Sequence, residues 1–427
     1  MFKRWVEMIL PLLKIKSLKT FSYICTILTK LSTTNPVKIY LFDSIESHNN
    51  LLPLSFTRPV ADFRCGILTI REKWEHYLPG DYDYYPVDYL RDKYGSDINP
   101  EEESLFIAGN LLPNLDLIKE IRALEAGEEL KKNEKRLAFR GRLDQFTSND
   151  GRSIEFEGNV DIIEYVFDIF LKNEIQIKYD FALITEGRSS APLPECVRTI
   201  TSHKGRLFLE EGAVVECATI NTNEGPVYVG KDAILMEGAC VRGPFALCEG
   251  AEVRMGAKIY EGTTIGPHCK VGGEISNTVF FGYSNKAHDG YLGNAVIGEW
   301  CNIGAGTNAS NLKNDYSLIR VWNYASRSFM KTDLQFCGLI MGDHSKIGVN
   351  CMINTATVVG VGVNIHGAGF PRAFVPCFCE GSPVTGFSQV PLKKFLDTAE
   401  RVMSRRDKSL SASDITLLSH IYSESQS

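Results

Sequence analysis

The chain has 427 residues, of which 44% are hydrophobic and 23% are charged, and its formal net charge is −6. This composition is that of an ordinary globular protein with about two or three domains, and it excludes a largely disordered chain. Because the lysines and arginines are scattered rather than grouped, charge gives no argument for nucleic acid as the partner and leaves a small anionic substrate open.

Twelve cysteines are spread along the chain, without a CxxC pair and without a histidine cluster at metal-ligand spacing. Cys377 and Cys379 are close together, but one intervening residue is poor spacing for a redox motif or a tetrahedral metal site. We therefore expect reduced thiols in a cytoplasmic protein, with neither a disulfide framework nor a structural zinc site.

Residues 1–36 hold short apolar runs that lysines interrupt, so no stretch of ~18 uncharged residues could span a membrane. A weak signal peptide and an interfacial amphipathic segment are alternatives, but we favour a non-functional extension from an upstream start codon. The folded part would then begin with a strand at Val37, and no membrane partner is expected.

Residues 37–190 alternate between the patterns of strands and helices. The apolar runs VKIYLF, SLFIAG and LAFR predict short strands. Apolar residues at helical spacing predict helices between Cys65 and Leu78, in LDLIKEIRAL and in DIIEYVFDIF. This alternation predicts an α/β domain with a largely parallel sheet.

Residues 200–386 have a different pattern, in which aliphatic residues recur at every sixth position. A helix would place every sixth residue on drifting faces, whereas short parallel strands joined by tight turns place these residues in one stacked core. The pattern therefore predicts a left-handed parallel β-helix of hexapeptide repeats. The repeated positions are Val229, Leu235, Val241, Leu247, Val253, Ile259, Ile265 and Val271, then Ile297 and Ile303, then Met341, Ile347, Ile353, Val359 and Ile365.

Residues 387–427 read as a short helical tail. Leu392, Leu396, Ala399 and Met403 lie on one face of a predicted helix, and SASD offers an N-cap for a second one. We expect this tail to pack on the β-helix or cap one of its ends; a regulatory or partner-binding tail is the alternative.

At the break in the hexad pattern between Val271 and Ile297, the chain reads SNKAHDGYLGNAVIGEWCNIGAGTNASN, residues 284–311. This segment resembles the acetyltransferase half of the GlmU family, whose members are bifunctional UDP-N-acetylglucosamine diphosphorylases and glucosamine-1-phosphate N-acetyltransferases. The order of an α/β domain before a β-helix is also similar, which implies a Rossmann-like nucleotidyltransferase domain over residues 37–190. The matching residues are Ser284, Lys286, Ala287, His288, Tyr291, Leu292, Gly293, Ala295, Ile297, Gly298, Asn302, Ile303, Gly304, Ala305, Gly306, Thr307 and Asn311.

His288 is the candidate catalytic base in this segment. An amino sugar binds mainly as its ammonium, and only the neutral amine can attack a thioester; a histidine, whose ordinary pKa is about 6.5, is suited to take that proton. Backbone N–H groups of the turn Gly304-Ala305-Gly306 could stabilise the oxyanion. A lone histidine, however, is more often structural.

The resemblance also implies binding roles. Tyr291, Asn302 and Asn311 would contact the amino-sugar phosphate or orient the base, and Ala305 would line the channel of the cosubstrate acetyl-CoA. Asparagines also stack at β-helix corners for purely structural reasons. Residues 312–336 form a longer insertion than the family has, and Lys313, Arg320, Arg327 and Lys331 in it are candidate replacement phosphate contacts.

The amino-terminal domain departs from the standard nucleotidyltransferase pattern. It lacks the Gly-rich phosphate loop, but Arg58, Arg64 and Gly66 stand where that loop would lead into the first helix, so they are candidate nucleotide-binding residues or, alternatively, structural ones. Asn110 in AGNLLPN replaces the family's acidic Mg²⁺ ligand and would be a weaker ligand. Mg²⁺ is accordingly an open expectation for the nucleotidyl step.

These observations lead to one hypothesis and two competitors. The first is a homotrimeric enzyme that N-acetylates glucosamine 1-phosphate with acetyl-CoA and then transfers uridylyl from UTP, making UDP-N-acetylglucosamine. The second is a nucleotidyltransferase for another sugar 1-phosphate with a regulatory β-helix. The third is a non-catalytic scaffold that binds sugar nucleotides.

Overall fold

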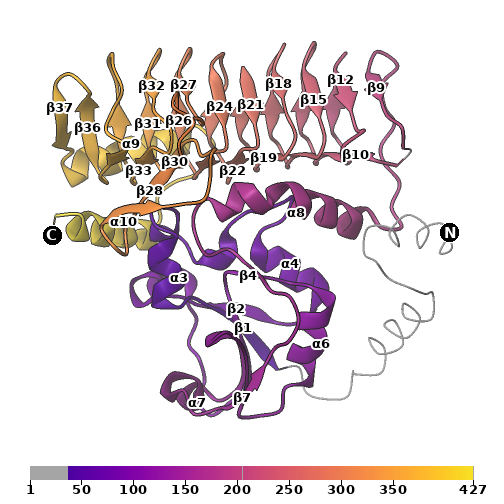
Figure 1. Ribbon diagram of the computed structural model, residues 1–427, viewed down its shortest axis with the longest axis vertical. Coiled ribbons are helices and arrows are strands. Elements are labelled where there is room, and N and C mark those ends of the chain that lie inside the picture. The colour runs from indigo at the N-terminus through magenta and orange to yellow at the C-terminus, as the bar shows by residue number, and fades with distance from the viewer. Residues whose placement is uncertain (1–36, 204, 427) are drawn as a thin grey trace.

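A computed structural model describes residues 37–203 and 205–426. It contains an α/β domain, a β-helix and a pair of carboxy-terminal helices (Figure 1). The possible extension over residues 1–36 lies outside the described residues. No helix within the described ranges is both long enough and apolar enough to cross a membrane.

The α/β domain is built on a six-stranded sheet in the order β2-β1-β3-β6-β5-β7. Strands β2, β1 and β3 are parallel, as predicted, but β6 runs antiparallel to both β3 and β5. The strands are β1 (Lys38–Phe42), β2 (Tyr82–Tyr85), β3 (Ser104–Ala108), β4 (Leu111–Leu112), β5 (Glu128–Lys132), β6 (Lys135–Gly141), β7 (Arg152–Glu155) and β8 (Asp161–Ile162). The helices are α3 (Ile45–Asn50), α4 (Ile70–Tyr77), α5 (Arg91–Tyr94), α6 (Leu115–Ala123), α7 (Leu143–Ser148) and α8 (Asp168–Thr185), with short 3₁₀ turns η1 (Leu54–Phe56), η2 (Val60–Asp62) and η3 (Asp88–Leu90).

The helix predicted over DIIEYVFDIF is wrong in position. Residues 161–167 form β8 and an irregular connection. Only the last three residues of the segment are helical, because α8 begins at Asp168 and runs to Thr185. Ile163 and Val166 are buried in the domain core without being helical. Because these two apolar residues are three positions apart, their pattern resembles that of a helix. Helix α8 then lies between the α/β domain and the β-helix (Figure 1).

The predicted left-handed parallel β-helix is confirmed, with three parallel sheets as its faces. In the ladder Val229 pairs with Leu247 and Leu247 with Ile265, so three hexads make one coil, and these aliphatic side chains are fully buried. The nine-stranded sheet is β10 (Leu207–Leu209), β13 (Val227–Val229), β16 (Phe245–Leu247), β19 (Thr263–Ile265), β22 (Val279–Phe280), β25 (Val296–Ile297), β30 (Ile340–Met341), β33 (Val358–Val359) and β35 (Phe374–Val375). The ten-stranded sheet is β11 (Val214–Val215), β14 (Ile234–Leu235), β17 (Glu252–Val253), β20 (Lys270–Val271), β23 (Asn285–Lys286), β26 (Asn302–Ile303), β31 (Lys346–Ile347), β34 (Asn364–Ile365), β36 (Cys379–Ser382) and β37 (Gly386–Gln389). The eight-stranded sheet is β9 (Arg198–Ile200), β12 (Thr219–Asn221), β15 (Cys240–Arg242), β18 (Lys258–Ile259), β21 (Glu274–Ser276), β24 (Tyr291–Gly293), β27 (Asn308–Ala309) and β32 (Met352–Ile353).

The two domains share a polar interface on the side of the nine-stranded sheet. Asn173 of α8 donates hydrogen bonds to the carbonyl of Gly262 (2.7 Å) and to the hydroxyl of Thr264 (3.0 Å). Phe63 packs on Phe281, with ring centroids 5.3 Å apart. The eight-stranded sheet lies on the opposite side, away from the α/β domain (Figure 1).

The helical tail consists of α9 (Leu392–Ser404) and α10 (Ala412–Glu424), and Ser411 caps α10. Phe395 of α9 packs on Phe378 of the β-helix, with ring centroids 4.9 Å apart. On the other side, Asp414 pairs with Lys93 of the α/β domain at 2.8 Å. The tail therefore joins the two domains rather than only capping an end of the β-helix.

Candidate active site

The corner between β23 and β24 presents His288 to solvent. Strand β23 belongs to the ten-stranded sheet and β24 to the eight-stranded sheet, so residues 287–290 form the turn between two faces of the β-helix. The His288 side chain is exposed on this turn. An exposed imidazole can reach a substrate outside the β-helix, which a buried structural histidine could not do.

Lys286 lies directly before this turn, in a position that points into the β-helix. It pairs with Val271 in the strand ladder, and its side chain is fully buried. Its ammonium donates hydrogen bonds to the backbone carbonyl oxygens of His288 and of Asp289, the latter at 2.9 Å. Burial lowers the pKa of Lys286 to about 8. The lysine therefore fixes the backbone that carries the candidate base.

Sequence analysis matched Lys286 to the family segment but missed this role. Its inward position is hidden because the repeat shortens before it. The inward residues Val271 and Ile275 are four positions apart, and Ile275 and Phe280 are five apart, so Lys286 is out of phase with the preceding hexads. A lysine in phase with buried aliphatic residues would have been the clue. The inward position of Lys286 becomes visible only when the shortened repeats before it are aligned with the regular hexads.

Tyr291 and Asn311 meet on the eight-stranded side of the corner. The side-chain amide of Asn311 donates to the Tyr291 hydroxyl at 2.9 Å and to the side-chain oxygen of Asn294 at 2.7 Å. The backbone N–H of Tyr291 donates to the side chain of Asn308 at 2.8 Å. The structure thus brings two of the predicted substrate-binding side chains together, but at the end of β24 opposite the turn that holds His288.

Ala305 lies on the same corner, one coil further along. Of the three N–H groups in its turn, that of Gly304 donates to Ile347 O and that of Gly306 to Asp289 O. Among the described residues, no hydrogen bond engages the N–H of Ala305. Of the three backbone N–H groups predicted to stabilise the oxyanion, only that of Ala305 therefore remains available within the described residues.

Asn302 lies on the other side of the corner. It is exposed on β26 of the ten-stranded sheet, where it lines a cavity together with Ala287. The structure does not bring it to the group of Tyr291 and Asn311. A ligand that touched both would have to pass around the corner at His288.

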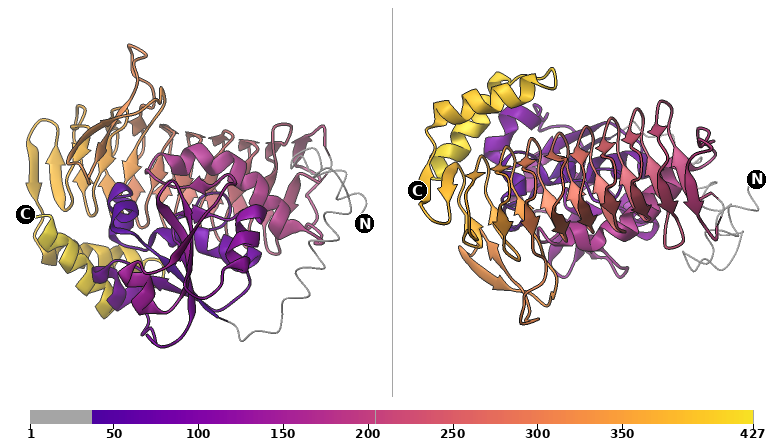
Figure 2. Two further views of the ribbon diagram at one scale, coloured as in Figure 1. Left: turned by 60° about the horizontal axis from the view of Figure 1, so that its bottom comes forward. Right: turned by 90° about the horizontal axis from the view of Figure 1, so that it is seen from above.

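The insertion over residues 312–336 forms a hairpin, β28 (Arg320–Asn323) and β29 (Ser328–Lys331), that projects from the β-helix (Figure 2). It leaves between β27 and β30, hence from a different corner than His288. Asn323 donates to Asn50 of the α/β domain at 3.2 Å. Within one chain, its cations are therefore not placed to hold a substrate phosphate beside His288.

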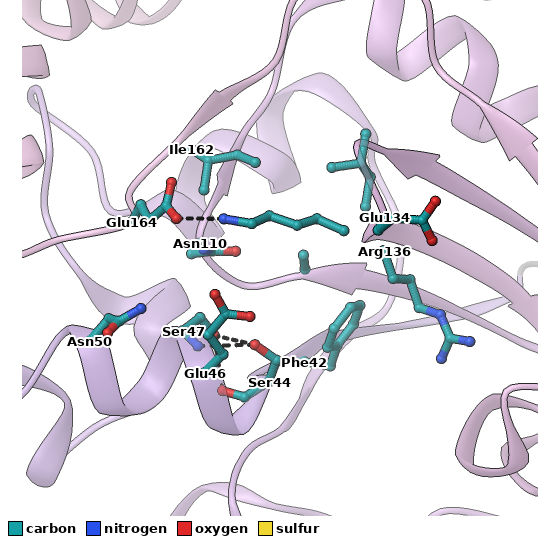
Figure 3. A pocket seen from close by; sticks show the side chains of 13 residues that line it. Phe42, Ser44, Glu46, Ser47, Asn50, Asn110, Glu134, Arg136, Ile162 and Glu164 are labelled. Carbon is teal, nitrogen blue, oxygen red and sulfur yellow. Dashed lines mark hydrogen bonds and ion pairs between the residues drawn. The ribbon is translucent and has the colours of Figure 1, made fainter. Parts of the chain in front are cut away.

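A second candidate site is a cavity of about 200 Å³ in the α/β domain, where β1 and β3 end. Its polar lining contains both acidic and basic side chains, and Lys135 pairs with Glu164 across it at 2.5 Å (Figure 3). In parallel sheets, the carboxyl ends of strands are where ligands bind. The lining residues are Phe42, Ser44, Glu46, Ser47, Asn50, Ala108, Asn110, Glu134, Lys135, Arg136, Leu137, Ile162 and Glu164.

Asn110 lines this cavity, and one of its two side-chain N–H groups donates to Ile163 O at 3.1 Å. Its neutral oxygen is the atom that could hold a metal ion. Among the described residues, no group of three or more histidine, cysteine, aspartate or glutamate side chains is arranged to hold a metal ion. The residues present therefore do not fit a resident Mg²⁺, and any Mg²⁺ would have to arrive with nucleotide phosphates as part of the substrate.

Arg58 does not line the cavity. Its guanidinium is buried at the domain interface, where it pairs with Asp343 and, at 3.1 Å, with Glu299 of the β-helix. The hydroxyl of Thr57 also donates to Asp343, at 2.7 Å. Arg58 is thus committed to joining the domains.

Arg64 and Gly66 have structural partners as well. The Arg64 guanidinium donates to Ile67 O and lies 3.7 Å from Glu72. Gly66 has a φ of +93°, donates to Asn173 at 2.6 Å, and any side chain on it would collide with the Asp180 carboxylate. These contacts favour the structural alternative for all three predicted nucleotide-binding residues.

Comparison with protein families shows that residues 39–189 match the model of the sugar nucleotidyl transferase family. The bifunctional protein GlmU of Gloeobacter violaceus is 30% identical over 118 residues, which is 27% of this chain and 22% of that protein. GlmU of Methylibium petroleiphilum is 27% identical over 181 residues, 40% of this chain and 33% of that protein. The chain thus spans a third or less of the length of these curated relatives, and the predicted resemblance to GlmU is confirmed at low identity.

Solved structures align with about half of this chain. A UDP-N-acetylglucosamine O-acyltransferase from Moraxella catarrhalis RH4 covers 54% of this chain and 94% of its own, at 11% identity and a TM-score of 0.25. A hexapeptide transferase family protein from Anaplasma phagocytophilum covers 53% and 96%, at 12% identity and a TM-score of 0.23. Because these scores are low, the fold assignment depends on the strand pairing itself.

Proposed function

Starting from a GlmU-like chain with a sugar nucleotidyl transferase domain, we propose that this protein N-acetylates an amino-sugar 1-phosphate, glucosamine 1-phosphate, with acetyl-CoA. The observation that carries this proposal is the exposed His288 on a turn whose backbone is held from inside by Lys286. A rigid turn with a free imidazole is what a surface-bound amine substrate requires of its base.

The proposed reaction has three proton movements. His288 takes a proton from the substrate ammonium, and the neutral amine attacks the thioester carbonyl carbon of acetyl-CoA. The N–H of Ala305 faces the developing oxyanion. The tetrahedral intermediate then expels the CoA thiolate, which receives the proton from His288. The nitrogen releases its second proton to water, so that the neutral amide remains on the sugar. Tyr291 and Asn311 would position the sugar phosphate.

The α/β domain would transfer uridylyl from UTP to the acetylated sugar phosphate in the cavity at the ends of β1 and β3. The proposal places Lys135 there as a phosphate contact, in place of Arg58, which joins the two domains, and of Arg64, which pairs within the α/β domain. A second function is that this domain binds a sugar nucleotide without turnover. It is favoured because Asn110 is held by Ile163 O and because no cluster of metal-binding side chains lies among the described residues.

The test is thiol release from acetyl-CoA with glucosamine 1-phosphate near neutral pH. His288→Ala should lower the rate by about 100-fold or more, while His76→Ala, which alters an exposed histidine of α4, should leave it unchanged. The absence of thiol release from a correctly assembled wild-type protein would contradict the acetyltransferase. Pyrophosphate release from UTP then separates nucleotidyl transfer from mere nucleotide binding.

A further inference from the structure

A second, larger cavity of about 550 Å³ lies between the ten-stranded sheet and the carboxy-terminal end of α9. Strands β17, β20, β23, β26 and β31 supply its floor, and Arg405 and Arg406, which follow α9, supply its rim. Neither the acetyl-transfer chemistry at His288 nor the cavity of the α/β domain accounts for it.

The charge of this cavity is one-sided. Five of its lining side chains are cationic and none is acidic: Arg254, Lys270, Lys346, Arg405 and Arg406. The neighbouring carboxylate of Glu252 pairs with two of these cations, with Lys270 at 2.5 Å and with Arg254 at 3.1 Å. Like charges gathered around one cavity repel one another, and a bound anion would relieve that repulsion.

Lys346 is the most informative of these cations. It is half-buried, and its ammonium donates to the backbone carbonyl of His344 at 2.6 Å. Within the described residues it has no carboxylate partner. Burial lowers the pKa of Lys346 to about 8. A lysine kept in such a place without a counter-ion is expected where the counter-ion comes from a ligand.

One wall of the cavity is aromatic. The rings of Tyr283 and Trp300 stack with centroids 4.3 Å apart and planes 12° apart, and both line the cavity. The stack continues to His268 beyond Tyr283 and to His344 beyond Trp300. The base of a ligand would therefore meet the edges of these rings while its phosphates meet the cations. A simple inorganic anion would make no use of the aromatic wall.

We propose that this cavity binds the nucleoside diphosphate part of a phosphorylated ligand, with its phosphates on Lys346 and Arg406 and its base against Tyr283 and Trp300. Arg406 also donates to Asn285 of β23 at 3.0 Å, so the ligand would fasten the helical tail onto the β-helix. The same chemistry is found in CoA and in a uridine sugar nucleotide. Binding at this cavity does not depend on turnover at His288.

Calorimetric titration of the full-length protein tests the site. ADP, UDP and CoA are the probes, and uridine and adenosine control for the phosphates. Lys346→Gln and Arg406→Gln should each weaken diphosphate binding by about 10-fold or more. Arg401→Gln, on the same helix but outside the cavity lining, should not weaken it. Each variant should have the same unfolding temperature as the wild type, which shows that weaker binding is not caused by misfolding.

The outcomes are distinct. Tighter binding of CoA than of UDP makes the cavity the diphosphate end of the cosubstrate site, and tighter binding of UDP makes it a site for the nucleotide product. The proposal is overturned if no diphosphate binds, or if Lys346→Gln and Arg401→Gln have the same effect. His288→Ala should leave binding intact, so failure of the acetyltransferase would be seen separately.

Discussion

Lys286 shows how one buried side chain can prepare a catalytic turn. Its stem replaces an aliphatic residue of the β-helix core, and its ammonium satisfies two carbonyl oxygens of the turn at His288. The cost of burying this lysine appears as the lowered pKa. A lysine that costs free energy in an otherwise apolar core is best explained by the turn that its ammonium holds in position.

Replacing this lysine should therefore separate stability from activity. Lys286→Met should lower kcat for acetyl transfer by about 10-fold or more because the His288 turn loosens, while stability is retained because an apolar side chain of similar length fills the core. Lys231→Met, at an exposed position between β13 and β14, serves as the control. Loss of folding in parallel with activity would contradict a positioning role.

Asp43 gives a pH prediction at the same scale. It follows β1 and is buried against the backbone N–H of Val60, and burial raises its pKa to about 8. The folded protein therefore keeps a proton that the unfolded chain gives up above about pH 4, so this group costs stability progressively as the pH rises from about 4 to 8.

Asp43→Asn should remove that cost. The stability of the variant relative to the wild type should rise between pH 5 and pH 8, by up to about 1.4 kcal/mol per pH unit. Urea unfolding at several pH values measures it, and Asp81→Asn provides an exposed control. Parallel curves for wild type and Asp43→Asn would show that the Asp43 carboxyl titrates normally.

At the scale of elements, the domains are joined by buried polar contacts rather than by a flexible linker alone. Arg58 comes from the segment between η1 and η2, and Asp343 comes from the corner before β31. The Asp343 carboxylate also accepts the backbone N–H of Glu299 at 2.8 Å. One carboxylate thus holds together two coils of the β-helix and the α/β domain.

Breaking this pair should be costly. Arg58→Met leaves the buried Asp343 carboxylate without its cation and should lower the free energy of unfolding by about 3–5 kcal/mol. Arg91→Met, which removes an exposed pair with Asp88, should cost about 0–1 kcal/mol. The double variant Arg58→Met/Asp343→Asn should lose less than the sum of the two single variants. If Arg58→Met weakened UTP binding without destabilising the protein, the nucleotide-binding alternative would return.

At the scale of the whole molecule, the corner that carries His288 is flanked by exposed apolar side chains. Met255 and Val349 are 70% and 65% exposed along it. A second copy of the chain packed there would cover them and complete the site, which is the arrangement expected for the proposed homotrimer.

Val349→Asp should therefore convert the assembly to monomers and abolish acetyl transfer, while nucleotide binding by the α/β domain is retained. Light scattering and thiol release measure the two effects. Ile45→Asp, which alters an exposed aliphatic residue of α3, should leave both unchanged. A wild-type monomer that transfers acetyl groups would rule out a shared site.

The sequence by itself determined the β-helix, because a period of six repeated over many coils forces each aliphatic residue into the same core position. The sequence also singled out His288 as the candidate base, because the segment around it matches a family motif at many positions and can be recognised without the tertiary structure. The order of the elements in the α/β domain also followed from local patterns. The helix α8, which lies between the two domains, was predicted several residues too early.

Only the tertiary structure decided what pairs with what. Arg58 meets Asp343 across 285 residues, so no local pattern could show that the predicted nucleotide ligand belongs to the domain interface. The cationic cavity likewise combines strands of the β-helix with the end of α9. Local spacing fixes which face of an element a side chain occupies, whereas docking between elements fixes whether that face meets solvent, a ligand or another carboxylate.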